Sequence, residues 1–167
     1  MKRSQTATAA FVIFAALAAA AQSGEQKSFA LMKTLIGNWE GKSAEGGPVR
    51  VSYRATAGGS AIMAEIQSDM KDHNEDMISM IHVDGDRLLL THYCAAGNQP
   101  RMQASASADG KTITFKFVDA TNLANPGQGH MDHVVFNFVD ADHHTEEWHF
   151  LVGGKEMIER FDLGKRG

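Results

Sequence analysis

Apolar and polar residues alternate along most of the chain after residue 48, and this is the period of β-strands. Val49, Val51 and Tyr53 alternate with polar neighbours, and comparable short runs recur as far as Leu163. Successive side chains of a strand point to opposite faces, so the alternation predicts strands with one buried face and one wet face. Eight to ten such runs, separated by turn signals, predict an all-β domain built from antiparallel hairpins.

Asp-Gly pairs mark two hairpin turns, and each turn predicts a register. A two-residue loop at Asp84-Gly85 places Ile81 opposite Leu88. A turn at Asp109-Gly110 sets small residues against large ones on one face of the sheet. The predicted pairs are Ile81–Leu88, Ser79–Leu90 and Met77–His92 in the first hairpin, and Ala106–Ile113, Ala104–Phe115 and Met102–Phe117 in the second.

A third hairpin joins residues 134–139 to residues 143–152, and its apolar side chains decide the loop length. A two-residue loop would leave its two apolar sets on different faces. A three-residue loop, Asp140-Ala141-Asp142, pairs Val134 with Trp148 and Phe136 with Glu146, and it gathers the apolar residues on one side. Burying each large apolar side chain is worth ~1.5–3 kcal/mol, so we expect the three-residue loop.

The first 21 residues have the pattern of a secretory signal peptide. Lys2 and Arg3 precede an apolar run from Ala9 to Ala20, and Ala19-Ala20-Ala21 offers a cleavage site, with a cut after Ser23 as the alternative. The run is shorter than the ~20 apolar residues of a membrane span. We therefore expect an exported protein, periplasmic or extracellular, with no stable membrane insertion after cleavage.

The expected mature chain has a leader, a short helix and one barrel. Residues 22–28 are polar, and we expect them to form a flexible leader. Apolar residues from Phe29 to Ile36 recur at helical spacing, and Gly37 suits the end of a helix. Residues 29–167 are then expected to form one antiparallel up-and-down barrel of eight to ten strands, because consecutive hairpin strands can pair throughout.

Charge and cysteine content narrow the function classes. The formal net charge is −4, and loss of Lys2 and Arg3 with the signal peptide would make it −6. A mildly acidic domain without a basic stripe argues against nucleic acid as a partner. Cys94 is the only cysteine, so the domain has no internal disulfide and its stability must come from core packing.

The order of these elements resembles the calycin group, meaning lipocalins and fatty-acid-binding proteins. A short helix precedes Gly37-Asn38-Trp39, and a meander of hairpins follows. The mature chain is also similar to uncharacterised secreted bacterial proteins of the DUF1579 type, through Gly58-Gly59-Ser60, residues 91–102 and Gly129-His130-Met131. The resemblance implies a barrel with an internal pocket and no defined activity. The chain departs from true lipocalins because it has no paired cysteines.

The segment 91–102 is rich in side chains with fixed hydrogen-bonding geometry. We interpret it as the polar end of a ligand pocket at the barrel mouth. The alternative is a structural loop in which Asn98 and Gln99 bond backbone groups and Arg101 pairs with a surface acid. The predicted ligand-binding residues are His92, Asn98, Gln99, Arg101, His130, Tyr53 and Trp148, and the predicted aromatic wall adds Phe115, Phe117 and Phe136.

The leading hypothesis is a barrel that binds a small, mostly apolar or amphipathic molecule with a polar end. The alternatives are an isomerase- or cyclase-type enzyme with His92 or His130 as acid–base, a haem- or metal-binding barrel, and a partner-binding envelope protein. Five histidines lie within residues 130–149, yet there is no His-x-His and no His-Glu-x-x-His motif. We therefore assign no metal ligands and no cofactor from the sequence.

Overall fold

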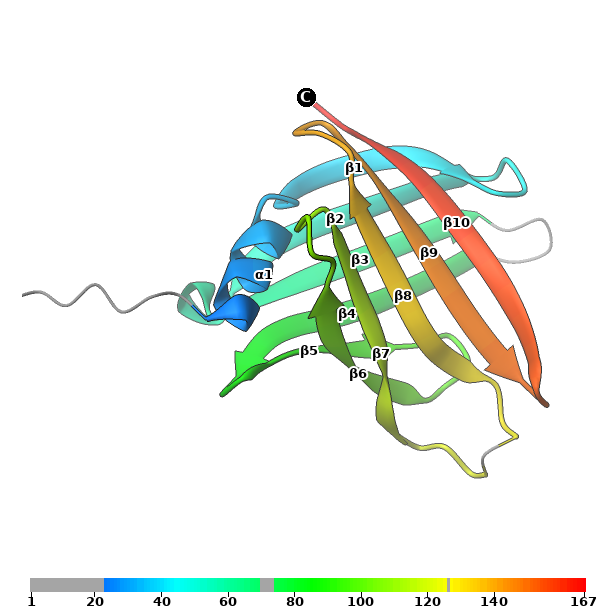
Figure 1. Ribbon diagram of the computed structural model, residues 1–167. Helices are drawn as coiled ribbons and strands as arrows, with labels where there is room; N and C mark the ends of the chain where they lie inside the picture. The colour runs from blue at the N-terminus through cyan, green and yellow to red at the C-terminus, as the bar shows by residue number, and fades with distance from the viewer. Residues whose placement is uncertain (1–22, 70–73, 126) are drawn as a thin grey trace, which may run out of the picture.

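The computed structural model describes residues 23–69, 74–125 and 127–167, and these form a closed barrel of ten antiparallel strands (Figure 1). Each strand pairs with the next along the chain, and β1 pairs with β10 to close the barrel, which confirms the all-β up-and-down fold. The strands are β1 (Gly37–Ser43), β2 (Pro48–Thr56), β3 (Ala61–Asp69), β4 (Asn74–Asp84), β5 (Arg87–Tyr93), β6 (Gln99–Ala106), β7 (Thr112–Thr121), β8 (His130–Phe138), β9 (His143–Val152) and β10 (Lys155–Lys165), with a 3₁₀ turn η1 (Ala57–Gly59).

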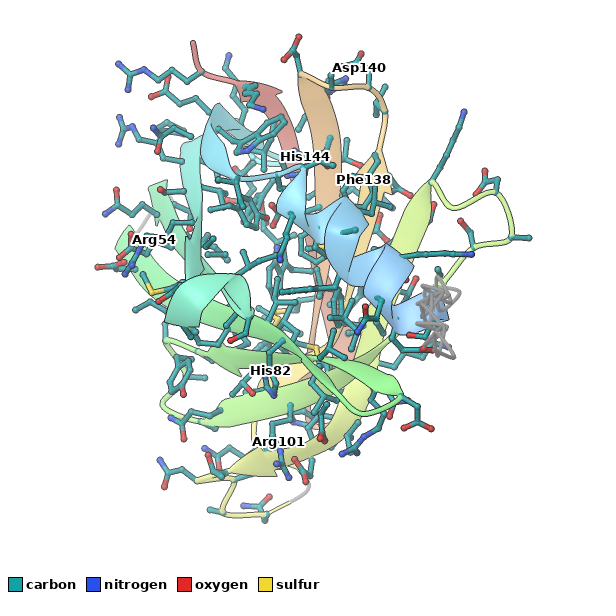
Figure 2. All side chains as sticks on the ribbon, turned by 90° about the vertical axis from the view of Figure 1, so that its left-hand side faces the viewer. Arg54, His82, Arg101, Phe138, Asp140 and His144 are labelled. Carbon is teal, nitrogen blue, oxygen red and sulfur yellow. The ribbon has the colours of Figure 1, made fainter. Side chains whose placement is uncertain are left out.

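Helix α1 (Gly24–Lys33) lies across one end of the barrel, and Figure 2 looks onto this end with α1 in front. The side chain of Ser23 accepts a hydrogen bond from the Gln26 N–H and caps the first turn. Residues 24–28 are therefore helical, and the prediction of a flexible leader over 22–28 is wrong for them. The predicted signal peptide, residues 1–21, lies outside the described residues.

The barrel end under α1 is filled. Met32 and Leu35 are buried there, and the Trp39 indole N–H donates to the Leu35 carbonyl oxygen at 2.6 Å. This bond ties β1 to the chain just after the helix. Among the residues that the structure describes, no helix has the length and apolar character of a membrane span.

The second and third hairpins have the predicted registers. Ala104 lies opposite Phe115, and Val134 lies opposite Trp148 across a three-residue loop. The first hairpin differs. Its loop is Gly85-Asp86, and Gly85 has φ 60° at the first loop position, as a type II′ turn requires.

The corrected first hairpin keeps every side chain on its predicted face, because the shift is by two residues. Ile81 now lies opposite Leu90, and Ser79 lies opposite His92. The predicted pairs Ile81–Leu88, Ser79–Leu90 and Met77–His92 are wrong. The new register brings the Ser79 hydroxyl to the His92 imidazole.

Two β-bulges interrupt the alternation of the strands. One lies between Arg101 and Met102 in the β6–β7 pairing, and the other between Met131 and His133 in the β8–β9 pairing. A bulge adds a residue to one strand and changes which side chains face inward beyond it. The first bulge adds Val118 to β7 and leaves the alternation of β6 unbroken. The second adds Asp132 to β8 and so affects His130, which the sequence placed in the ligand site.

Candidate ligand-binding site

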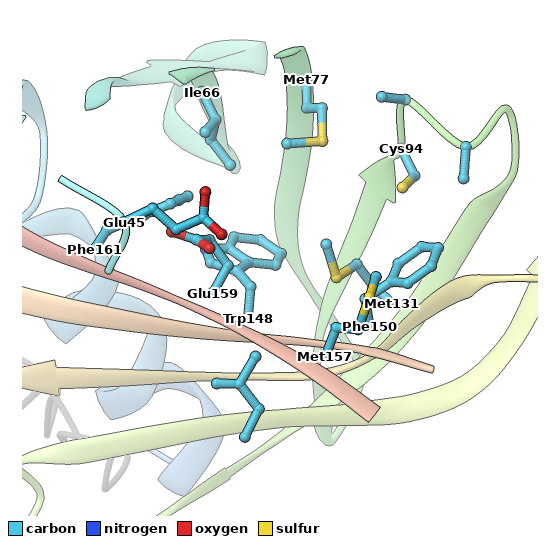
Figure 3. A pocket seen from close by; sticks show the side chains of 13 residues that line it. Glu45, Ile66, Met77, Cys94, Met131, Trp148, Phe150, Met157, Glu159 and Phe161 are labelled. Atoms are coloured by element: carbon cyan, nitrogen blue, oxygen red, sulfur yellow. The ribbon is translucent and has the colours of Figure 1, made fainter. Parts of the chain in front are cut away.

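A pocket of about 670 Å³ lies at the barrel end opposite α1 (Figure 3). It is formed where β3 and β9 end and where β4, β8 and β10 begin. Most of the side chains on it are apolar, among them Ile66, Met77, Met131, Trp148, Phe150 and Phe161. At the barrel end beside α1, by contrast, Met32 and Leu35 are buried.

The pocket combines adaptable thioethers with rigid aromatic rings. Met77, Met131 and Met157 line it together with Trp148 and Phe150. Methionine side chains are unbranched and polarizable, and they adjust to irregular apolar surfaces. The pocket can therefore accept apolar molecules of varied shape.

Two carboxylates also line the pocket, Glu45 and Glu159. Glu45 lies in the turn between β1 and β2, and the Ala44 N–H donates to Glu159 Oε1 at 3.2 Å. Both side chains bring negative charge to an otherwise apolar cavity. An anionic ligand group would be repelled there, and a hydrogen-bond donor or a cation would be attracted.

A buried carboxylate lies beneath Trp148. Glu146 is 1% exposed, and three donors surround it. The Tyr53 hydroxyl donates to Oε1, His144 Nε2 lies 3.1 Å from the same oxygen, and the Trp148 indole N–H donates to Oε2 at 2.9 Å. Burial, and next the charge and hydrogen bond of Glu146, raise the pKa of Tyr53 well above its ordinary value. This network holds the indole that lines the pocket.

His92 lies against the other side of Trp148, with 4.8 Å between the ring centroids. Its Nδ1 is 2.9 Å from Ser79 Oγ, and its Nε2 has no hydrogen-bond partner among the described residues. Burial lowers the pKa of His92 from 6.5 to about 4. The imidazole is therefore neutral near neutral pH and is poorly suited to serve there as a general acid.

Acid should destabilise the fold through His92. Between pH 6.5 and 4 the unfolded chain binds a proton at this residue and the folded chain does not, so the free energy of unfolding falls as the pH falls. A shift of this size corresponds to about 3 kcal/mol at pH 4. Urea unfolding should be measured at pH 7.5 and at pH 4.5. The free energy of unfolding should fall less between these two pH values in His92→Gln than in the wild type, and an equal fall in both would contradict the prediction.

Asn98, Gln99 and Arg101 are not brought together. Asn98 is fully buried, and its Nδ2 donates to the Gly129 carbonyl oxygen at 2.7 Å. Arg101 points outward at the periphery of the barrel and pairs with Asp119 (Figure 2), and Gln99 accepts from the Thr121 hydroxyl on the surface. Strand alternation places these two side chains on the outer face, so the expectation that they share an interior polar end is corrected.

The bulge at Asp132 changes the position of His130. Met131 lies opposite Phe150 and lines the pocket, whereas His130 lies opposite Leu151. His130, which the sequence predicted to bind the ligand, is therefore not among the described residues that line the pocket. His130 is 6% exposed, its ring centroid is 4.8 Å from that of Phe117, and its Nδ1 is 2.9 Å from the Gln128 carbonyl oxygen.

The predicted aromatic residues divide between pocket and core. Trp148 lines the pocket, and Tyr53 belongs to the buried network beneath it. Phe115 and Phe136 are packed edge to face, with centroids 5.8 Å apart, and fill the barrel centre. They support the pocket without lining it.

Sequence reasoning missed Glu146 and His144 as members of the interior network. The signal was present, because the three-residue loop of the third hairpin already placed Glu146 opposite Phe136 on the apolar face. An acid at an inward position needs hydrogen-bond donors around it. Tyr53 donates from β2, 93 residues away in the sequence, and only the closed barrel brings it to Glu146 of β9.

The closed barrel and its end pocket define a calycin-like barrel. No family model and no curated protein matches the sequence. Among solved structures, the chain is similar to Rv2717c from M. tuberculosis, with a TM-score of 0.59 and 15% identity over 84% of this chain and 98% of that one. It is also similar to a DUF3598-family protein of unknown function from Nostoc punctiforme, with a TM-score of 0.52 and 9% identity over 81% of this chain and 49% of that one. These similarities support the barrel fold alone.

Proposed function

We propose that this chain is an exported binding protein that holds a small, mostly apolar molecule in the pocket at the end of its barrel. The volume of about 670 Å³ carries the proposal, because ligand sites typically occupy ~300–1,000 Å³. The resemblance to secreted lipocalin-like barrels of the DUF1579 type, together with the signal-peptide pattern of residues 1–21, supports export.

The polar end of the ligand is proposed to be a donor or a cation. Glu45 and Glu159 supply acceptors at the pocket, and neither His92 nor Arg101 is among the described residues that line it. An alkyl amine or alcohol should therefore bind more tightly than the fatty acid of the same length. The polar end that the sequence suggested, around residues 92–101, is replaced in this proposal by the two glutamates.

The acid–base and haem alternatives receive less support. Each needs His92 or His130 to reach the ligand, and the described pocket lining contains neither. His92 is fully buried, and His130 lies on the far side of the β8 bulge at Asp132. Binding without chemistry is the function that the geometry supports best.

Dodecylamine, dodecanol and dodecanoate should be tested as ligands by tryptophan fluorescence. The chain has two tryptophans, and Trp148 alone lies at the pocket, so Trp39→Phe isolates its signal. We expect saturable changes for the amine and the alcohol and a dissociation constant at least tenfold higher for the carboxylate. A tenfold difference corresponds to about 1.4 kcal/mol.

Met157→Glu and Val118→Glu form a matched pair for this experiment. Both side chains are exposed, at 57% and 47%, but only Met157 lines the pocket. Met157→Glu should weaken dodecanol binding at least tenfold, and Val118→Glu should leave it unchanged. Equal effects of the two substitutions, or no binding of any of the three compounds, would overturn the proposal. Native mass spectrometry of protein from its own host would then identify a retained molecule.

A further inference from the structure

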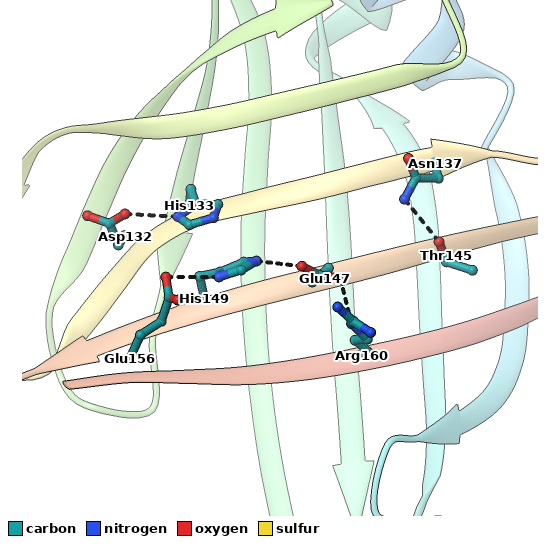
Figure 4. A network of polar contacts seen from close by, with 8 residues as sticks. All are labelled: Asp132, His133, Asn137, Thr145, Glu147, His149, Glu156 and Arg160. Carbon is teal, nitrogen blue, oxygen red and sulfur yellow. Dashed lines mark hydrogen bonds and ion pairs between the residues drawn. The ribbon is translucent and has the colours of Figure 1, made fainter. Parts of the chain in front are cut away.

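The outer face of β8, β9 and β10 carries a cluster of two histidines and a glutamate (Figure 4). His133 and His149 lie directly opposite each other on neighbouring strands, with ring centroids 3.6 Å apart and an interplanar angle of 19°. One ligand atom from each of His133, His149 and Glu156 lies within 4.8 Å of the others. The cluster is separate from the pocket, because none of the three residues lines it.

Carboxylates lie against one nitrogen of His133 and against both nitrogens of His149. Asp132 Oδ2 is 2.9 Å from His133 Nδ1, and Glu147 Oε1 is 2.8 Å from His149 Nε2. The remaining nitrogen of His149, Nδ1, is 3.0 Å from Glu156 Oε1. Metal-binding histidines typically have a carboxylate on the nitrogen that does not bind the ion, and Asp132 and Glu147 have this position here. An ion at His149 Nδ1 would replace the contact of this nitrogen with Glu156.

The charge around the histidine pair favours a cation. Three carboxylates, Asp132, Glu147 and Glu156, surround it, and Arg160 pairs with Glu147 at 2.5 Å. The three carboxylates outnumber the one guanidinium, so the side chains around the two imidazoles are acidic.

We propose that His133, His149 and Glu156 bind a divalent transition metal of the zinc class. Two imidazole nitrogens and one carboxylate are a ligand set that zinc accepts, with a fourth position left for water. Zinc–nitrogen bonds of ~2.0–2.1 Å place tetrahedral ligands about 3.3 Å apart. The three ligand atoms lie within 4.8 Å of one another. A bound ion lies in the plane of each imidazole, so the two stacked rings, 19° apart, would have to rotate about their side-chain bonds to share it.

Zinc chloride and cobalt chloride should be titrated into the full chain, purified without a polyhistidine tag. We expect one ion per chain, a tetrahedral cobalt spectrum, and displacement of cobalt by zinc. His133→Gln and His149→Gln should each lower zinc affinity at least 100-fold, measured by competition with a chromogenic chelator. Asp132→Asn, which alters only the orienting carboxylate, should lower it by about 10–100-fold.

His82→Gln and Glu156→Gln separate metal binding from folding. His82 lies on β4, away from the cluster, and its replacement should leave zinc affinity unchanged. Glu156 is exposed, so Glu156→Gln should retain the wild-type circular dichroism spectrum and still lose at least tenfold in affinity. The proposal would be overturned if folded Glu156→Gln and either histidine variant bound zinc as tightly as the wild type. It would also be overturned if the chain bound several ions weakly and His82→Gln reduced that binding.

Discussion

Gly41→Ala is expected to lower the free energy of unfolding by about 4 kcal/mol or more, beyond the usual range for an overpacked site. Gly41 lies in β1, opposite Leu163 of β10, where the barrel closes. A Cβ atom at this position would lie 1.7 Å from the backbone carbonyl oxygen of Asp162. Backbone cannot rotate away as a side chain can, so the two strands would have to separate.

Gly164→Ala is the matched control, since Gly164 belongs to the same pair of strands. Its added Cβ would have a single neighbour, the Glu40 carbonyl oxygen at 3.9 Å, which is an ordinary contact. We expect its stability to stay within about 1 kcal/mol of the wild type. Urea unfolding of both variants gives the comparison, and a tolerated Gly41→Ala would show that β1 and β10 do not pair as described.

Glu146→Ala is expected to destabilise the protein by about 3–5 kcal/mol, which is typical of removing one partner from a buried polar network. The substitution leaves the Tyr53 hydroxyl, His144 Nε2 and the Trp148 indole N–H without the acceptor that they share. Unsatisfied buried donors cost about 1–3 kcal/mol each. Without its hydrogen bond to Glu146, the Trp148 indole should adopt a wider range of orientations, and its fluorescence should change.

Glu146→Gln and Glu65→Ala calibrate this result. Glutamine keeps one acceptor oxygen but turns a donor toward the remaining groups, so we expect an intermediate loss. Glu65 lies on β3 and is partly exposed, and its replacement should change stability by no more than about 0.5 kcal/mol. Equal stabilities of Glu146→Ala and Glu65→Ala in chemical unfolding would show that the buried network does not form.

The barrel and two of its registers followed from the sequence because burial decides them. In the third hairpin, one loop length alone places Val134, Phe136 and Trp148 on the same side, so the apolar pattern was sufficient. The first hairpin could not be decided in this way. Loops at Asp84-Gly85 and at Gly85-Asp86 differ by two residues in register and leave every side chain on the same face.

The site was harder to predict because it depends on local irregularity and on distant strands. Strict alternation gives no sign of the bulge at Asp132, which exchanges His130 for Met131 at the pocket. The histidine cluster was missed for a different reason, because its residues come from neighbouring strands. Motif spacing along one strand gave no reason to assign metal ligands, yet the predicted register of Val134 with Trp148 already placed His133 opposite His149. Cross-strand neighbours need to be searched as well as sequence motifs.

The pairing of β1 with β10 has a consequence for how the chain folds. Lys42 and Asp162 are partners 120 residues apart (162 − 42), so the cylinder cannot close until nearly the whole polypeptide has been released. Contacts between such distant residues slow folding. A chain that is truncated before its last strand would retain two exposed sheet edges, which are templates for aggregation.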